Sequence, residues 1–380
     1  MEITELVDTL LTDENNKTCL TVTINTHRMN NEAEQDPLRF KNLLQDAHKQ
    51  LIENDFSDQQ AEEFLGEITK FRNQPRFWRE QQEGLIFFVS DEMIYYVNLP
   101  FDVESNVYLN DHFYILPLIR LEQQDQEYYV LALSKNKIRL FKAQRTSIEE
   151  VELEDLPSSY EEFTQFDVFE TSLSKGNTGA NGSSNFHGIG DASDSKQRLG
   201  ELLIKQVESA VTDYLRKQNA PLLLAGVSDI TSHYLKYNHY HTVWEKDSLL
   251  GNPDRMSKEE IHRKSLIISK QKIMNNIYDI ADDSTNLLNT GRFIYDINEL
   301  LKAAHYGQVD TLFVQTDGAE YGTYDSENDQ VMRKGDANTD LYNLAAIKCL
   351  QNSGSVYLLD RDHMPQKTDI SAVLRYPVQA

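Results

Sequence analysis

The sequence contains few cysteines, no long apolar run and no excess of basic side chains. Its only two cysteines, Cys19 and Cys349, lie near opposite ends and form neither a disulfide framework nor a metal-binding spacing. No apolar run approaches the roughly 18–20 residues that cross a bilayer. The acidic start, Met1–Glu5, lacks the basic stretch and apolar core of a signal peptide. We therefore expect a protein of the reduced cytoplasm, with no membrane partner.

The charge balance argues against general nucleic-acid binding. Lysine and arginine number 37 against 61 aspartates and glutamates, which gives a formal net charge of −24. The acidity is concentrated in the first third, because residues 1–124 contain 10 basic and 23 acidic side chains. Steering of the whole chain toward nucleic acid is thus disfavoured. We expect no DNA partner, and any RNA-contacting surface must be a local patch.

The sequence also lacks the common cofactor and nucleophile motifs. It has no glycine-rich phosphate loop, no Gly-x-Gly-x-x-Gly after a strand, and no serine in a nucleophile-elbow context. His233, His239 and His241 lie close together in the sequence, but a zinc site needs three or four converging ligands. The pattern favours a tyrosine-rich amphipathic turn. We therefore predict no catalytic residue, no metal and no cofactor.

Helices and strands alternate along the chain, which is typical of an α/β (α+β) fold with mixed β-sheets and packed helices. Polar breaks at Glu122–Glu127 and Gly251–Asp254 divide the chain into three predicted domains. These are an N-terminal α/β domain at 1–124, a central domain at 125–252 and a C-terminal domain at 253–380.

The first segment begins with a β-branched run, Cys19–Ile24, that predicts a strand. Asp36, followed by proline, opens a predicted helix, and Ser57 with Gln60 forms a capping box for the next helix. A predicted hairpin follows, with strands at 85–89 and 93–97. Its aromatic residues could form a base-stacking platform. The aromatic residues are Phe87, Phe88, Tyr95 and Tyr96, and the strand pattern instead favours their being core residues that alternate with surface ones.

The central segment contains two predicted strands, at 128–133 and 138–141. The stretch 171–195 is rich in Gly, Ser, Asn and Asp and has no periodicity, so it predicts a long mobile loop. A helix is expected at 196–217, and the apolar run at 221–227 is typical of a buried central strand. In the last segment a capping box is predicted at 257–260 and a helix at 341–350. Strands are predicted at 309–314, 356–359 and 372–376.

Short sequence stretches in all three segments are similar to stretches of a known protein family and occur in the same order. They lie at 18–26, 83–89, 107–113, 128–133, 187–190, 223–226, 296–304 and 307–314. The chain resembles the bacterial archaeo-eukaryotic release factors, which are relatives of the class-one release factors and of Pelota. The resemblance implies a protein that enters the ribosomal A site in the shape of a tRNA. It also implies a C-terminal α/β/α sandwich of the ribosomal-protein-like release-factor type.

Three departures from the family pattern bear on activity. The catalytic loop of release factors carries Gly-Gly-Gln, whereas the matching loop here is His187–Ala192 and the nearest glutamine, Gln197, falls in the predicted helix. No Asn-Ile-Lys-Ser element lies between residues 28 and 43. The Tyr-Cys-Phe decoding motif is reduced to Tyr108, Asn110 and Phe113. Neither peptidyl-tRNA hydrolysis nor stop-codon reading is therefore expected.

The expected function is that of a non-catalytic, translation-associated factor in ribosome rescue or ribosome hibernation, as for Pelota and the hibernation factor Balon. The partners that the resemblance implies are the ribosome, through rRNA, and a translational GTPase such as elongation factor Tu. Two alternatives stay open. One is a hydrolase of peptidyl-tRNA or another ester that uses His187. The other is a protein-interaction module outside translation, with the acidic first domain as its contact surface.

The central loop and the start of the helix after it form the predicted rRNA-contacting site. Glycines allow a backbone to approach a ligand closely, and lysine and arginine side chains contact phosphates. The alternative is an ordinary surface insertion. The predicted site residues are His187, Gly188, Gly190, Lys196, Arg198 and Lys205.

Overall fold

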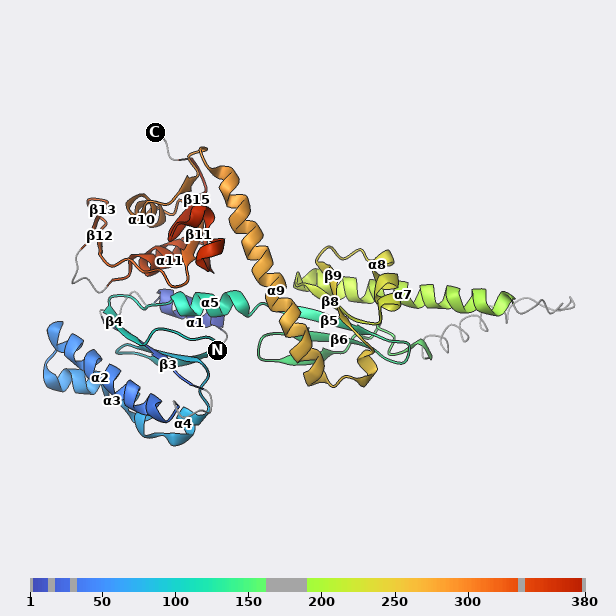
Figure 1. Ribbon diagram of the computed structural model, residues 1–380, viewed down its shortest axis with the longest axis horizontal. Coiled ribbons are helices and arrows are strands. Elements are labelled where there is room, and N and C mark those ends of the chain that lie inside the picture. The colour runs from blue at the N-terminus through green and yellow to red at the C-terminus, as the bar shows by residue number, and fades with distance from the viewer. Residues whose placement is uncertain (1–2, 13–17, 28–32, 162–189, 334–338, 378–380) are drawn as a thin grey trace, which may run out of the picture. The chain divides into compact units, whose positions relative to one another are not determined.

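The computed structural model describes residues 3–12, 18–27, 33–161, 190–333 and 339–377, with the backbone alone for 190–197 (Figure 1). The chain divides into two compact units: unit 1 combines Met1–Gln123 with Asn276–Ala380, and unit 2 is Gln124–Asn275. Within the described residues, no helix is both long and apolar enough to cross a membrane. The expected mixed α/β fold is confirmed, because helices pack on several mixed sheets. The division into three domains stays a prediction.

The first sheet of unit 1 is antiparallel, with the strand order β3-β2-β1-β4. Its strands are β1 (Cys19–Asn25), β2 (Gly84–Val89), β3 (Ile94–Leu99) and β4 (Asn106–Asn110). The predicted strand at 19–24 and the predicted hairpin are confirmed. Helices on one face are α2 (Asp36–Glu53), α3 (Asp58–Thr69) and α4 (Pro75–Arg79). The short helix η1 (Ala33–Gln35) precedes α2, and η2 (Lys70–Asn73) joins α3 to α4. The Ser57–Gln60 capping box is present at the start of α3.

Strand β2 is buried on both of its faces, which corrects the expected alternation of core and surface residues. Phe87 packs toward α2, where its ring centroid lies 5.2 Å from that of Phe40. Phe88 points to the opposite face, where α1 (Ile3–Thr12) and α5 (Leu116–Gln124) cover the sheet. A strand covered on both faces has a continuous apolar run, so alternation does not appear in its sequence.

The second sheet of unit 1 has the strand order β10-β15-β11-β14. Its strands are β10 (Phe293–Ile294), β11 (Val309–Gln315), β14 (Ser355–Leu359) and β15 (Ile370–Leu374). Helices α10 (Ile297–His305) and α11 (Leu341–Gln351) pack with it, and β12 (Thr323–Asp325) pairs with β13 (Gln330–Met332). One continuous apolar core joins this sheet to α1, α5 and the inner face of the first sheet. The first and last segments of the chain therefore fold together.

Unit 2 contains a five-stranded sheet with the order β7-β6-β5-β8-β9. Its strands are β5 (Tyr128–Leu133), β6 (Ile138–Ala143), β7 (Ile148–Val151), β8 (Leu222–Gly226) and β9 (Val243–Leu250). The predicted buried strand is confirmed as β8, which runs parallel to β5 and β9. Helices α7 (Gly190–Gln218) and α8 (Ser228–Tyr237) cover one face, and the first turns of α9 (Lys258–Ser284) cover the other.

The predicted loop at 171–195 is too long at its C-terminal end. Helix α7 begins at Gly190, so residues 190–195 are helical and Gly190 is a helix residue rather than a loop residue. The sequence Asp-Ala-Ser-Asp-Ser that follows contains residue types that favour both loops and helix starts, which explains the error. His187 and Gly188 lie outside the described residues.

Candidate functional site

The N-terminal turns of α7 extend beyond the five-stranded sheet of unit 2 (Figure 1). Arg198 and Lys205 both lie on this helix and both are exposed. They are seven residues apart, which is about two helical turns or roughly 10 Å, and so they share one face. Leu203 and Val207 face the sheet instead, where they are buried. The structure therefore brings two predicted site residues together on a solvent-facing stripe.

Tyr237, which no sequence pattern indicates as a site residue, lies beside this stripe. The Nζ atom of Lys205 lies 4.9 Å from the centroid of the Tyr237 ring, and the Nζ atom of Lys236 lies 5.4 Å from it. The ring of His233 is 5.9 Å away from that of Tyr237. Cations near an aromatic ring are attracted to its face, and each such contact contributes about 0.5–1 kcal/mol at exposed sites. The spacing of Tyr237 and Lys236 gives no hint of the contact, because Lys205 comes from another helix.

A largely apolar pocket of about 420 Å³ opens next to this surface. It lies between α7, α8 and the β5–β6 turn, and His233 and Lys135 are among its lining residues. Its floor includes Leu203 of α7 and Ile230 of α8. We name Arg198, Lys205, His233, Lys236 and Tyr237 the α7–α8 surface. It combines cations for phosphate contacts with a ring on which a base can stack.

The histidines of the 233–241 stretch make separate contacts. His239 contacts Glu208, a buried residue of α7, through a backbone hydrogen bond of 2.8 Å to Oε1 and a ring contact of 3.4 Å between Nδ1 and Oε2. Thr212 also donates to Oε1 of Glu208, at 2.8 Å. The ring of His241 instead lies near that of Tyr240, with centroids 5.2 Å apart. Across the residues that the structure describes, no group of three or more histidine, cysteine or acidic side chains could hold a metal.

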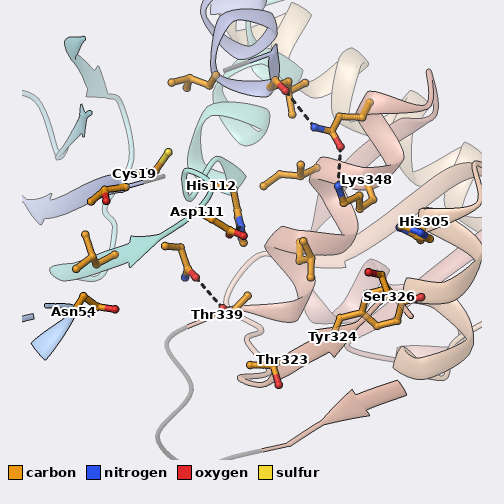
Figure 2. A pocket seen from close by; sticks show the side chains of 18 of the residues that line it. Cys19, Asn54, Asp111, His112, His305, Thr323, Tyr324, Ser326, Thr339 and Lys348 are labelled. Atoms are coloured by element: carbon orange, nitrogen blue, oxygen red, sulfur yellow. Dashed lines mark hydrogen bonds and ion pairs between the residues drawn. The ribbon is translucent and has the colours of Figure 1, made fainter. Parts of the chain in front are cut away.

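Unit 1 contains a separate polar pocket of about 850 Å³ (Figure 2). The Nδ1 atom of His112 lies 2.6 Å from Oδ1 of Asp111, and this hydrogen bond lowers the pKa of the Asp111 carboxyl. Lys348, on α11, lies near this pair and donates to Oε1 of Gln351 at 3.2 Å. The amide of Gln351 in turn donates to the Leu11 carbonyl at 3.1 Å. These contacts tie α11 to α1.

The remnants of the decoding motif take part in packing within unit 1. The ring of Tyr108 stacks on Tyr114 with centroids 4.0 Å apart. The Thr339 hydroxyl donates to Oδ1 of Asn110 at 2.9 Å (Figure 2). Phe113 is buried, and its carbonyl accepts a hydrogen bond of 2.9 Å from the side-chain amide of Asn343. All three residues thus make contacts within unit 1.

The structure describes only the backbone of some of the remaining predicted site residues, and others lie outside the described residues. Lys196 and Gln197 lie within α7, as expected for Gln197, but their side chains are outside the described part of the chain. The hydrolase alternative depends on His187, which also lies outside the described part.

The α7–α8 surface lies within a segment of the chain that matches a known protein family. Residues 128–271 match the model of Bacterial archaeo-eukaryotic release factor family 7. No curated protein matches the chain. Over residues 128–271 the chain is thus release-factor-like, and the resemblance expected from the sequence is confirmed there. The matched segment contains the whole α7–α8 surface.

Several solved structures are similar to the chain at low sequence identity. A crystal structure of Archaeoglobus fulgidus Pelota is 12% identical, covers 78% of this chain and 80% of its own, and has a TM-score of 0.32. S. cerevisiae Dom34 is 14% identical, with coverages of 77% and 81% and a TM-score of 0.35. An archaeal translation termination factor is 11% identical over 99% of both chains, with a TM-score of 0.23. With TM-scores this low, these likenesses carry no further argument.

Proposed function

We propose that this protein is a non-catalytic, translation-associated factor that binds the ribosome in rescue or hibernation. The observation that carries the proposal is that the α7–α8 surface lies inside the release-factor-like segment. In a chain with a net charge of −24, a local group of cations around an aromatic ring fits a contact with RNA. The proposed location is the cytoplasm.

Each part of the α7–α8 surface has a role in this binding. Arg198 and Lys205, which lie about two turns of α7 apart, each contact a phosphate. Tyr237 offers a ring against which a base stacks. The partners are rRNA and a translational GTPase, for which elongation factor Tu is the candidate. No ester hydrolysis is proposed, because the Gly-Gly-Gln sequence of the release-factor loop is missing.

Charge reversal on α7 tests this role. The variant Arg198→Glu with Lys205→Glu should bind purified ribosomes at least tenfold more weakly in co-sedimentation. It should also reduce the slope of log K against log salt by about 0.7–0.9 for each phosphate that the variant no longer binds. Tyr237→Ala should weaken binding by about 1–3 kcal/mol if a base stacks on the ring.

A matched control uses the other end of the same helix. Arg216→Glu with Lys217→Glu makes the same change in net charge at two exposed positions of the last turn. This control should retain wild-type binding. If both double variants weaken binding equally, or if neither does, the α7–α8 surface is not the contact and the surface-insertion alternative is favoured.

A further inference from the structure

A groove in unit 1 lies far in sequence from the release-factor-like segment. It has a volume of about 890 Å³ and runs between α3 with η2 on one side and the turn that joins β2 to β3 on the other. Along α3 and η2 its lining extends from Gln60 to Phe71, which corresponds to roughly 16 Å at 1.5 Å per residue. That length accommodates about three turns of a helix.

The floor of the groove is apolar and only partly buried. Five of its eleven lining residues are apolar, and all five retain some exposure: Phe56, Phe64, Phe71, Met93 and Ile94. The rings of Phe56 and Phe64 pack edge-on with centroids 6.0 Å apart, and Phe71 packs against Phe77 at 4.9 Å. The rings are thus held by neighbours while one side stays open. Such a surface favours an apolar partner.

The rim of the groove carries a single sign of charge. Glu63 and Glu67 are one turn apart on α3, and Asp91 and Glu92 lie on the opposite turn; all four are exposed. None of the eleven lining residues is basic. Lys70, at the end of α3, forms an ion pair with Glu67, but a pair between two exposed side chains is weak and can be exchanged.

We infer that this groove binds a basic amphipathic peptide segment of another protein. Apolar side chains on one face of the segment would cover the phenylalanine floor, and lysines or arginines on its flanks would pair with the two acidic rims. An acidic rim disfavours RNA, and it also disfavours a second copy of this chain, whose net charge is −24. The inference does not depend on whether the protein binds ribosomes.

A synthetic probe tests the inference with the full chain. The probe is a fluorescein-labelled peptide of about 14 residues, with leucines at helical i, i+3, i+4 and i+7 spacing and lysines elsewhere. A control peptide carries glutamates in place of the lysines. Fluorescence anisotropy at roughly 0.15 M salt, where distant charges are screened, should show saturable binding of the lysine peptide only.

Three variants separate the groove from general acidity. The rim variant, Glu63→Lys with Glu92→Lys, should weaken binding about tenfold. The matched control, Glu53→Lys with Glu62→Lys, makes the same charge change in the same unit, at exposed positions that do not line the groove. It should bind like the wild type. Met93→Ser removes an apolar side chain from the floor without changing the charge, so it should also weaken binding, and circular dichroism checks that each variant is folded.

Two results would overturn the inference. Equal weakening in the rim variant and its matched control would mean that the peptide binds by general charge attraction. A concentration-dependent dimer in sedimentation velocity that the rim variant abolishes would show that a second copy occupies the groove.

Discussion

The buried carboxyl of Asp340 links folding to pH in unit 1, and its replacement by asparagine gives a quantitative test. Asp340 precedes α11, is 4% exposed, and accepts a hydrogen bond of 2.9 Å from the Tyr342 backbone amide. Burial raises the pKa of its carboxyl from 3.8 to about 6. Asparagine retains an oxygen for the helix cap and removes the charge.

The sign and size of the effect follow from the raised pKa. Between its unfolded pKa near 3.8 and its folded pKa near 6, the native state of Asp340 binds more protons than the unfolded state. The contribution of Asp340 to stability is therefore fully present below its unfolded pKa. It is lost as the pH rises through its folded pKa. At about 1.4 kcal/mol for each unit of pKa, the whole loss is about 3 kcal/mol. Between about pH 5 and pH 8 the loss is about 1.4 kcal/mol.

Urea unfolding of both proteins at these two pH values measures the effect. The free energy of unfolding of Asp340→Asn, relative to the wild type, should rise by about 1–1.5 kcal/mol from about pH 5 to pH 8. Comparing the two proteins removes the contributions of carboxyls with lowered pKa values, such as Asp111 and Asp329. A difference that stays constant with pH, or that falls as the pH rises, would refute the assignment of a raised pKa to Asp340.

Three further predictions concern activity, boundaries and packing. A reconstituted release assay should show no cleavage of peptidyl-tRNA in response to stop codons, and cleavage above buffer would contradict the loss of Gly-Gly-Gln and of the decoding motif. Limited proteolysis should cut first near residues 124 and 252 or in the 171–195 region; early cuts within β5 or β8 would contradict the predicted boundaries. Gly226→Ala should lower the free energy of unfolding by about 1–3 kcal/mol, since a Cβ atom there would lie 2.9 Å from the Leu133 carbonyl oxygen. Unchanged urea unfolding of Gly226→Ala would show that β8 can shift without cost.

Local signals in the sequence were sufficient to predict most elements. The β-branched run at Cys19, the capping box at Ser57 and the apolar run of β8 depend on neighbours within a few residues, and each was found where expected. The final strand was predicted at 372–376 but lies at Ile370–Leu374. Such ends depend on pairing with a distant strand, here β11.

Features that depend on distant contacts could not be predicted in the same way. The burial of Phe88 in a core shared with the last segment joins residues more than 200 positions apart, and no local pattern indicates it. The proximity of Lys205 to Tyr237 depends on how α7 and α8 pack against each other. The charges of Arg198 and Lys205 could be selected from the sequence, whereas the aromatic partner could not.

The distribution of the endogenous protein across a sucrose gradient tests ribosome binding most directly. We predict that the protein migrates with intact ribosomes in magnesium-containing buffer. It should shift to the top of the gradient at high salt, because phosphate contacts are salt-sensitive. A protein that stays at the top of the gradient in low salt and magnesium, under growth and under starvation alike, would contradict ribosome binding.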